Sequence, residues 1–97
     1  MRVSVEVFSS FEWDLDKCAR NIEKHGIDFN RALTALEAPR LEQQSERNGE
    51  IRTLAICQEP QKLITIVYTM RGETCRIISI RAARKNEQRA YRQILGR

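Results

Sequence analysis

Three runs of apolar and β-branched residues, joined by short turns, constrain the fold of this chain more than any other feature. The runs cover residues 50–57, 63–70 and 74–81. Runs of this length and composition favour β-strands, and connections as short as those around Pro60 and Gly72 join antiparallel neighbours. Asn48-Gly49 is a two-residue hairpin signal that adds a weaker strand over residues 40–44. The sequence therefore predicts an antiparallel meander of three or four strands.

Two helices are expected before this meander. Asp14 is a suitable N-cap for a helix in which apolar residues recur at helical spacing, and Gly26 follows its last turn. Asp28 is expected to cap a second, shorter helix that Pro39 ends. His25 falls in the last turn of the first helix, where a cationic side chain interacts favourably with the helix dipole.

The two ends of the chain complete the predicted fold. Alternation over residues 3–7 indicates a half-buried strand, with residues 11–13 as its candidate continuation. A final helix is expected over residues 83–95, with Tyr91 and Ile94 on or near its packed side. Residues 1–97 are expected to form one α+β domain, an antiparallel sheet with two N-terminal helices and one C-terminal helix.

Positive charge is concentrated in the C-terminal part of the chain. Residues 71–97 hold eight basic and two acidic residues, a net charge of +6, whereas residues 1–70 carry a net charge of −2. Thirteen of the seventeen basic residues are Arg, whose planar guanidinium favours bidentate contacts with phosphate or carboxylate. A basic face is typical of a protein that binds a polyanion, and a solvated basic helix explains the same asymmetry. Charge alone leaves both interpretations open.

Cysteine usage and hydropathy argue against a disulfide-bonded, zinc-binding or membrane-spanning protein. Cys18, Cys57 and Cys75 are odd in number and lack CxxC spacing, which indicates buried, reduced thiols rather than a disulfide framework or a zinc site. The chain has no Gly-rich phosphate loop and only one histidine, so no metal and no other cofactor is expected. No stretch is long enough to span a bilayer and the N-terminus does not resemble a signal peptide, so no membrane partner and a cytoplasmic location are expected.

RNA phosphodiester cleavage is a chemistry that these residue types support without a metal. The 2′-hydroxyl of the substrate attacks phosphorus, and the protein supplies a base, an acid and cations. His25 is the natural proton-transfer candidate, in competition with its structural role at the helix end. Arg52 and Arg76 on neighbouring strands are candidate phosphate ligands, because a strand arginine is costly unless it faces solvent or a partner. Simple alternation puts Arg76 and Arg81 on opposite faces unless a bulge intervenes, and Tyr91 suits a core position as well as a site.

Two ordered blocks of the sequence resemble the BrnT family of type II toxin–antitoxin systems. The first block is Phe11-Glu12-Trp13-Asp14, followed by Lys17, Asn21 and Lys24-His25-Gly26-Ile27-Asp28-Phe29. The second block comprises Gly49-Glu50-Ile51-Arg52, Val67-Tyr68-Thr69 with Arg71, residues 76–83, Glu87 and Tyr91. The resemblance spans about residues 11–91. The chain departs from the family pattern where Thr53-Leu54 replaces a common aromatic, and where Arg84 stands at a position at which Thr often caps the last helix.

The resemblance implies a RelE-like fold and an endoribonuclease that arrests translation. It also implies neutralisation by a BrnA-like antitoxin with a ribbon-helix-helix domain, in a two-to-two complex that reaches operator DNA only through the antitoxin. The matching polar positions, expected to be catalytic, are Lys24, His25, Glu50, Arg52, Arg76, Arg81 and Tyr91. We expect the three arginines of this set to bind phosphate and His25 or Lys24 to move protons. Arg71, Arg84 and Lys85 are expected to bind RNA or the antitoxin.

Two non-catalytic interpretations use the same basic face. The chain could be a nucleic-acid-binding module, or a toxin fold kept only as a co-repressor subunit. A binding module for single-stranded nucleic acid usually presents aromatic side chains for base stacking, and only 6% of this chain is aromatic. Together with the motif match, this favours a metal-independent endoribonuclease that acts on RNA.

Overall fold

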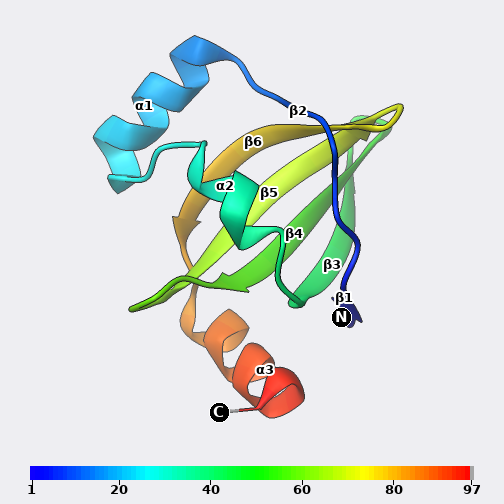
Figure 1. Ribbon diagram of the computed structural model, residues 1–97, viewed down its shortest axis with the longest axis vertical. Helices are drawn as coiled ribbons and strands as arrows, with labels where there is room; N and C mark the ends of the chain where they lie inside the picture. Colours follow the sequence, from blue (N-terminus) through cyan, green and yellow to red (C-terminus); the bar gives the residue numbers. More distant parts are fainter. Residues whose placement is uncertain (97) are drawn as a thin grey trace.

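The computed structural model describes residues 1–96 as six strands and three helices (Figure 1). In chain order these are β1 (Arg2–Ser4), β2 (Phe11–Glu12), α1 (Leu15–His25), α2 (Arg31–Ala35), β3 (Arg40–Arg47), β4 (Glu50–Gln58), β5 (Leu63–Arg71), β6 (Thr74–Ala82) and α3 (Lys85–Leu95). The strands form one sheet in the order β1-β3-β4-β5-β6-β2. All neighbours are antiparallel except β2 and β6. The α+β prediction is confirmed, and β3 to β6 form the expected meander. Within residues 1–96 no helix has the length and apolar character needed to cross a membrane.

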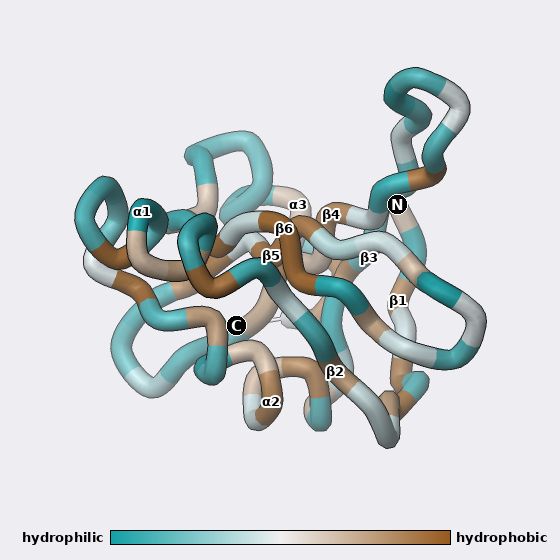
Figure 2. Tube along the Cα trace, turned by 90° about the horizontal axis from the view of Figure 1, so that it is seen from above, coloured by the Kyte–Doolittle hydropathy of each residue, from teal (hydrophilic) through white to brown (hydrophobic). Residues whose placement is uncertain are grey.

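Helices α1 and α2 pack on one face of the sheet and close the larger hydrophobic core. In Figure 1, α2 lies in front of the sheet, and Figures 1 and 2 both place α1 at the β6 side and β1 at the opposite edge. Phe29, between the two helices, is completely buried and meets Trp13 edge to face at a centroid distance of 6.2 Å. All three cysteines are buried and free, as the sequence predicts.

The N-terminal strand is shorter than the predicted residues 3–7. Only Arg2–Ser4 pairs with β3, and the side chains of Val5 and Val7 are 69% and 64% exposed. The fully buried Arg40 explains the departure from the ladder, because its guanidinium donates to the carbonyl of Glu6 at 2.7 Å. Phe8 then packs against the guanidinium of Arg40, 5.3 Å from the ring centroid. The segment therefore crosses the sheet face that α1 and α2 also cover, instead of extending β1.

The second helix is shorter than predicted and is not capped by Asp28. Helix α2 covers Arg31–Ala35, and no side chain caps it. The Asp28 carboxylate instead accepts hydrogen bonds from the backbone of Asn30 at 3.0 Å and from the Cys18 thiol at 3.5 Å. This local turn directs Phe29 into the core, and the helix begins only after the turn is complete.

Helix α3 covers only one end of the opposite sheet face. Leu41, Ile56, Leu63 and Ala83 are buried there, with Ala90, Tyr91 and Leu95 of α3 packed against them. Ile94 was expected on or near the packed side but is 50% exposed, and the α3 side chains that pack on this cluster are Ala90, Tyr91 and Leu95. The middle of this face, which we call the open sheet face, comprises Arg52, Leu54, Val67, Thr69, Arg76 and Ser79.

Candidate functional site

Strand register places polar side chains in rows across the open sheet face. Leu54 pairs with Val67 and Val67 with Ser79, which form a middle row of half-buried side chains. One row further from α3, Ser45 pairs with Arg52, and Arg76 pairs with both Thr69 and Glu12. Two strand spacings separate Arg52 from Arg76, or about 10 Å.

A bulge in β6 brings Arg76 and Arg81 to the same face. Val67 pairs with Ser79, but the next residue of β5, Tyr68, pairs with Ile77, so Ile78 is an extra residue in β6. An inserted residue shifts the alternation of side chains by one position. Simple alternation would have put Arg76 and Arg81 on opposite faces. The sequence allows for a bulge that would change this, and the bulge is present.

Arg52 and Arg76, in the row further from α3, each form an ion pair with a carboxylate of the same chain. Arg52 Nε lies 3.3 Å from Glu50 Oε1, and Arg76 Nη1 lies 3.0 Å from Glu12 Oε2. Arg71 reaches the other oxygen of Glu50 at 3.7 Å. The side chains of Arg52 and Arg76 are each 28% exposed, so their guanidinium groups remain accessible from solvent.

Arg81 is engaged differently, in a bidentate pair with Glu87 of α3. The two guanidinium nitrogens lie 2.8 and 3.0 Å from the two carboxylate oxygens. Glu87 also accepts from the Thr65 hydroxyl at 2.9 Å and from the backbone of Arg84 at 2.8 Å. Burial alone would raise the pKa of Glu87, but these hydrogen bonds outweigh it and lower the pKa to about 2. This cluster fastens α3 to the sheet.

Helix α1 is fastened to the edge of β6 by one side-chain amide. Asn21 Nδ2 donates to the carbonyl of Ile80 at 2.9 Å, and its Oδ1 accepts from the Ile80 backbone N–H at 3.2 Å. The same Nδ2 donates to the carbonyl of Ile27. The amide therefore takes the place of a neighbouring strand and holds α1 along β6 beyond the point where β2 ends.

This docking creates a shallow pocket at the edge of the open sheet face. The pocket is lined by Lys17, Arg20, Asn21, Lys24, His25, Ile78 and Ser79. Ser79 lies between Arg76 and Arg81 along β6, so the two proton-transfer candidates, Lys24 and His25, reach the edge of the arginine rows. His25 also ends α1 before Gly26, whose φ of 72° is left-handed as expected.

The remaining sequence candidates lie near α3. Tyr91 is half-buried against the cluster that includes Ile56, a residue about 13 Å along β4 from Arg52. Burial raises the pKa of Tyr91, and the nearby Cys57 adds to this effect. Arg84 and Lys85 are exposed at the start of α3, beside Arg81. The structure therefore groups Arg52, Arg76, Lys24 and His25 around the open sheet face and leaves Tyr91 outside this group.

Sequence reasoning missed four residues of this region. From the sequence, no functional role was expected for Glu12, Lys17, Arg20 or Ser79. Lys17, Arg20 and Lys24 recur at spacings of three and four, which places them along one face of α1, so their periodicity was a usable signal. The pairing of Glu12 with Arg76 had no sequence signal, because these residues are 64 positions apart.

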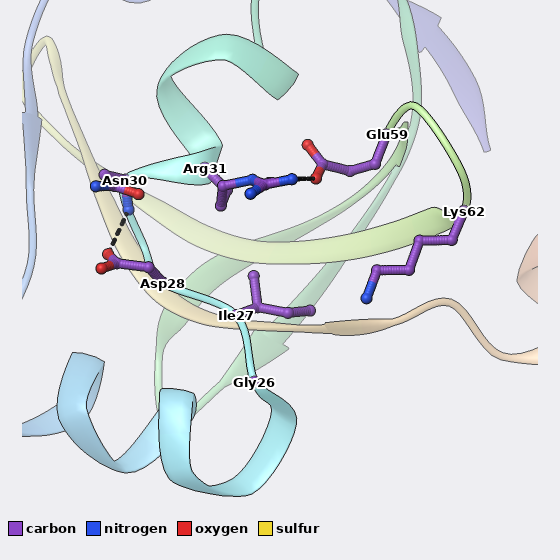
Figure 3. A pocket seen from close by; sticks show the side chains of 7 residues that line it. All are labelled: Gly26, Ile27, Asp28, Asn30, Arg31, Glu59 and Lys62. Carbon is purple, nitrogen blue, oxygen red and sulfur yellow. Dashed lines mark hydrogen bonds and ion pairs between the residues drawn. The ribbon is translucent and has the colours of Figure 1, made fainter.

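A second pocket lies on the α2 side and is chemically distinct. Figure 3 shows it, with Arg31 pointing to Glu59 and Lys62 extending toward Ile27. Arg31 Nε donates to Glu59 at 3.1 Å, so the arginine is already neutralised. Within residues 1–96 no group of three His, Cys, Asp or Glu side chains is placed to hold a metal ion.

Comparison with known proteins identifies the family. No curated protein matches the chain. A family model described as the ribonuclease toxin BrnT of type II toxin–antitoxin systems matches residues 13–87. This range includes α1, the meander and the start of α3, while β2 and its Glu12 lie just before it. The chain belongs to the BrnT family of type II toxin–antitoxin ribonuclease toxins.

Proposed function

We propose that this toxin is a metal-independent endoribonuclease that cleaves RNA on the open sheet face. The observation that carries the proposal is the row of Arg52 and Arg76 on a sheet face that α3 leaves uncovered. The Lys24 and His25 pocket at the edge of the same face supplies groups that can transfer protons. A single RNA strand fits such an open surface better than an enclosed small molecule does.

The chemistry requires one bond to form and one to break at phosphorus. A base removes the proton of the 2′-hydroxyl, the O2′–P bond forms, the P–O5′ bond breaks, and an acid protonates the departing O5′. The products are a 2′,3′-cyclic phosphate and a 5′-hydroxyl. Arg52 and Arg76 stabilise the charge that develops on the phosphoryl oxygens, while His25 or Lys24 transfers protons. Glu50 orients Arg52 through their ion pair.

Arg81 and Tyr91 support the same site from the α3 side. Both guanidinium nitrogens of Arg81 that face Glu87 are occupied, so we assign Arg81 a share of the positive potential and the anchoring of α3. Tyr91 packs in the cluster beneath α3 and holds the helix end in place. Arg71, Arg84 and Lys85 lie exposed around the face and extend its positive potential.

The biological part of the proposal follows from the family. The toxin arrests translation in the cytoplasm by cleaving RNA, and a BrnA-like antitoxin with a ribbon-helix-helix domain neutralises it in a two-to-two complex that binds operator DNA through the antitoxin. Carboxylates of an antitoxin segment can pair with Arg52 and Arg76 once these are desolvated. Reversing both charges, Arg52→Glu with Arg76→Glu, should therefore weaken antitoxin binding, and full affinity for the antitoxin would count against this interface.

Cleavage of a labelled RNA by the purified chain in EDTA tests the proposal. The comparison is between wild type, the double variant Arg52→Ala with Arg76→Ala, and the control Arg2→Ala with Arg31→Ala, which removes two arginines outside the face. Wild type and control should yield 2′,3′-cyclic phosphate ends, and the first variant should cleave at least about 100-fold more slowly. The assay is repeated in a translating extract, so that a requirement for the ribosome is detected.

Two results would contradict the proposal. Equal cleavage by all three proteins would mean a contaminating nuclease or a site elsewhere. RNA binding without cleavage, in buffer and in the extract, would favour the binding-module or co-repressor interpretation.

A further inference from the structure

The cations around the open sheet face fall into two classes. Each arginine of β4 and β6 is neutralised within the chain: Arg52 by Glu50, Arg76 by Glu12 and Arg81 by Glu87. No ion pair among residues 1–96 involves the three cations of α1, which are Lys17, Arg20 and Lys24. We call these three residues the α1 stripe. The arginines must exchange an ion-pair partner to bind phosphate, whereas the residues of the α1 stripe form no ion pair with the described residues that must first be broken.

The α1 stripe continues the open sheet face beyond its edge. The three side chains line one pocket with Ile78 and Ser79, and Ser79 ends the middle row of the face. The Asn21 amide holds this side of α1 against β6, so the stripe has a fixed position beside the sheet. Figure 1 shows α1 lying beside β6. A ligand that crosses the sheet along the middle row reaches the stripe when it leaves β6.

Length and charge identify the ligand that fits. From Lys17 to Lys24 the helix rises about 10 Å, which is long enough for more than one backbone phosphate of a nucleic-acid strand. The α1 stripe also lines a shallow pocket against β6. Repeated phosphates match a row of exposed cations that make no ion pair within residues 1–96, because each contact releases condensed counterions and adds affinity regardless of base sequence.

We propose that the α1 stripe is an RNA-backbone subsite, which holds the strand where it leaves the sheet next to β6. This inference rests on the proposed function, because it assumes that RNA occupies the open sheet face. Lys17 and Arg20 bind phosphates flanking the scissile one and supply much of the salt-dependent affinity. They are not catalytic residues, since the reacting phosphate lies over Arg52 and Arg76.

Equilibrium binding of a short, labelled, fully 2′-O-methylated single-stranded RNA tests the subsite. The methyl groups prevent attack by the 2′-oxygen, so binding is measured without cleavage. The test variant is Lys17→Ala with Arg20→Ala, and the matched control is Lys62→Ala with Arg2→Ala. Each removes one exposed Lys and one exposed Arg, and the control positions lie away from the α1 stripe. Alanine is a favourable helix residue, so α1 should fold normally in the test variant.

The test variant should bind about tenfold or more weakly near 0.1 M salt, and the slope of log K against log salt should become shallower by about 1.4. The control should stay within about threefold of wild type and keep its slope. Equal losses in both variants would show an effect of net charge alone and overturn the subsite. Unchanged RNA affinity in the test variant would also overturn it, and would assign the α1 stripe to the antitoxin if antitoxin affinity fell instead. If wild type bound no free RNA at all, the subsite would fail, whereas the proposed function would still be decided by the cleavage assay in the translating extract.

Discussion

Burial separates two kinds of arginine–glutamate pair in this molecule. The side chains of Arg81 and Glu87 are 16% and 6% exposed, and the pair is bidentate. Arg76 and its partner Glu12 are 28% and 42% exposed and share one contact. Exposed single-contact pairs contribute little to stability, whereas a hydrogen-bonded buried pair is costly to break. Arg76 can therefore exchange its carboxylate for a phosphate, while Arg81 holds α3.

The lowered pKa of Glu87 predicts a specific loss of stability in acid. Its pKa is about 2 in the folded chain against an ordinary value of 4.5, so the carboxylate contributes stability above pH 4.5 that is lost as the pH falls toward 2. Between pH 5 and pH 2, the free energy of unfolding of wild type should fall more than that of Glu87→Gln, by about 2 to 3 kcal/mol.

Urea titrations at a series of pH values measure this difference. Glu73→Gln is the control, because Glu73 is exposed in a turn and accepts none of these hydrogen bonds. The free energy of unfolding of the Glu73→Gln protein should change with pH as that of wild type does. A Glu87→Gln protein with the wild-type pH response would show that the cluster does not favour the ionised form.

At the scale of elements, the two long helices begin differently. The Asp14 carboxylate accepts from the backbone of Asp16 and Lys17 and so caps α1 as predicted. Arg84 precedes α3 with N-cap backbone angles, φ −75° and ψ 163°, but a guanidinium has no acceptor to offer. Only the reciprocal bond is made, from the Arg84 backbone N–H to Glu87. The start of α3 therefore has half of a capping box.

Completing this box should stabilise the protein. Arg84→Thr supplies the missing hydroxyl acceptor while Glu87 still accepts from residue 84, so we expect a gain of about 1 kcal/mol. For a chain of this size the thermal midpoint, measured by circular dichroism, should rise by about 4 to 8 °C. Arg89→Thr is the control, since it removes the same side chain from the exposed middle of α3 and should cost a few tenths of a kcal/mol. Equal midpoints for both variants would contradict the capping explanation.

Strands and helices differed in how far the sequence could predict them. The ends of β4, β5 and β6 agree with the predicted runs to within one residue, because alternation and turn residues are local signals. Both Asn48 and Gly49 have positive φ, as the hairpin signal requires. The N-terminal strand ends earlier than predicted and Asp28 does not cap α2, because Arg40 and Phe29 draw those segments into other contacts. Local pattern carries no information about such distant partners.

The molecule as a whole is a sheet with unequal cover on its two faces. One face is closed by α1, α2 and the Phe8 segment, and the other is closed only where α3 lies. All three cysteines lie in the larger hydrophobic core, and each is at most 8% exposed. Burial raises the pKa of the Cys57 and Cys75 thiols to about 12. The fold as a whole therefore shields these thiols from reagents in solution.

Thiol reactivity should thus report opening of the whole molecule. At neutral pH the native chain should react with a disulfide reagent much more slowly than the chain unfolded in guanidinium, in which three thiols react at once. The native rate should rise with denaturant in parallel with global unfolding. One thiol that reacts rapidly in the native chain would show that a core segment opens locally.

The sequence by itself determined the fold class, the meander and the helix ends at Asp14 and Gly26, and it supplied the candidate residues of the proposed RNA site. These are consequences of periodicity, turn chemistry and side-chain type, which are written over a few neighbouring residues. Only the tertiary structure decided which of those residues meet. The bulge at Ile78 put Arg76 on the face of Arg81, and the Asn21 amide placed the α1 stripe beside Ser79. Register and docking depend on contacts between residues far apart in the chain, and no local pattern encodes them.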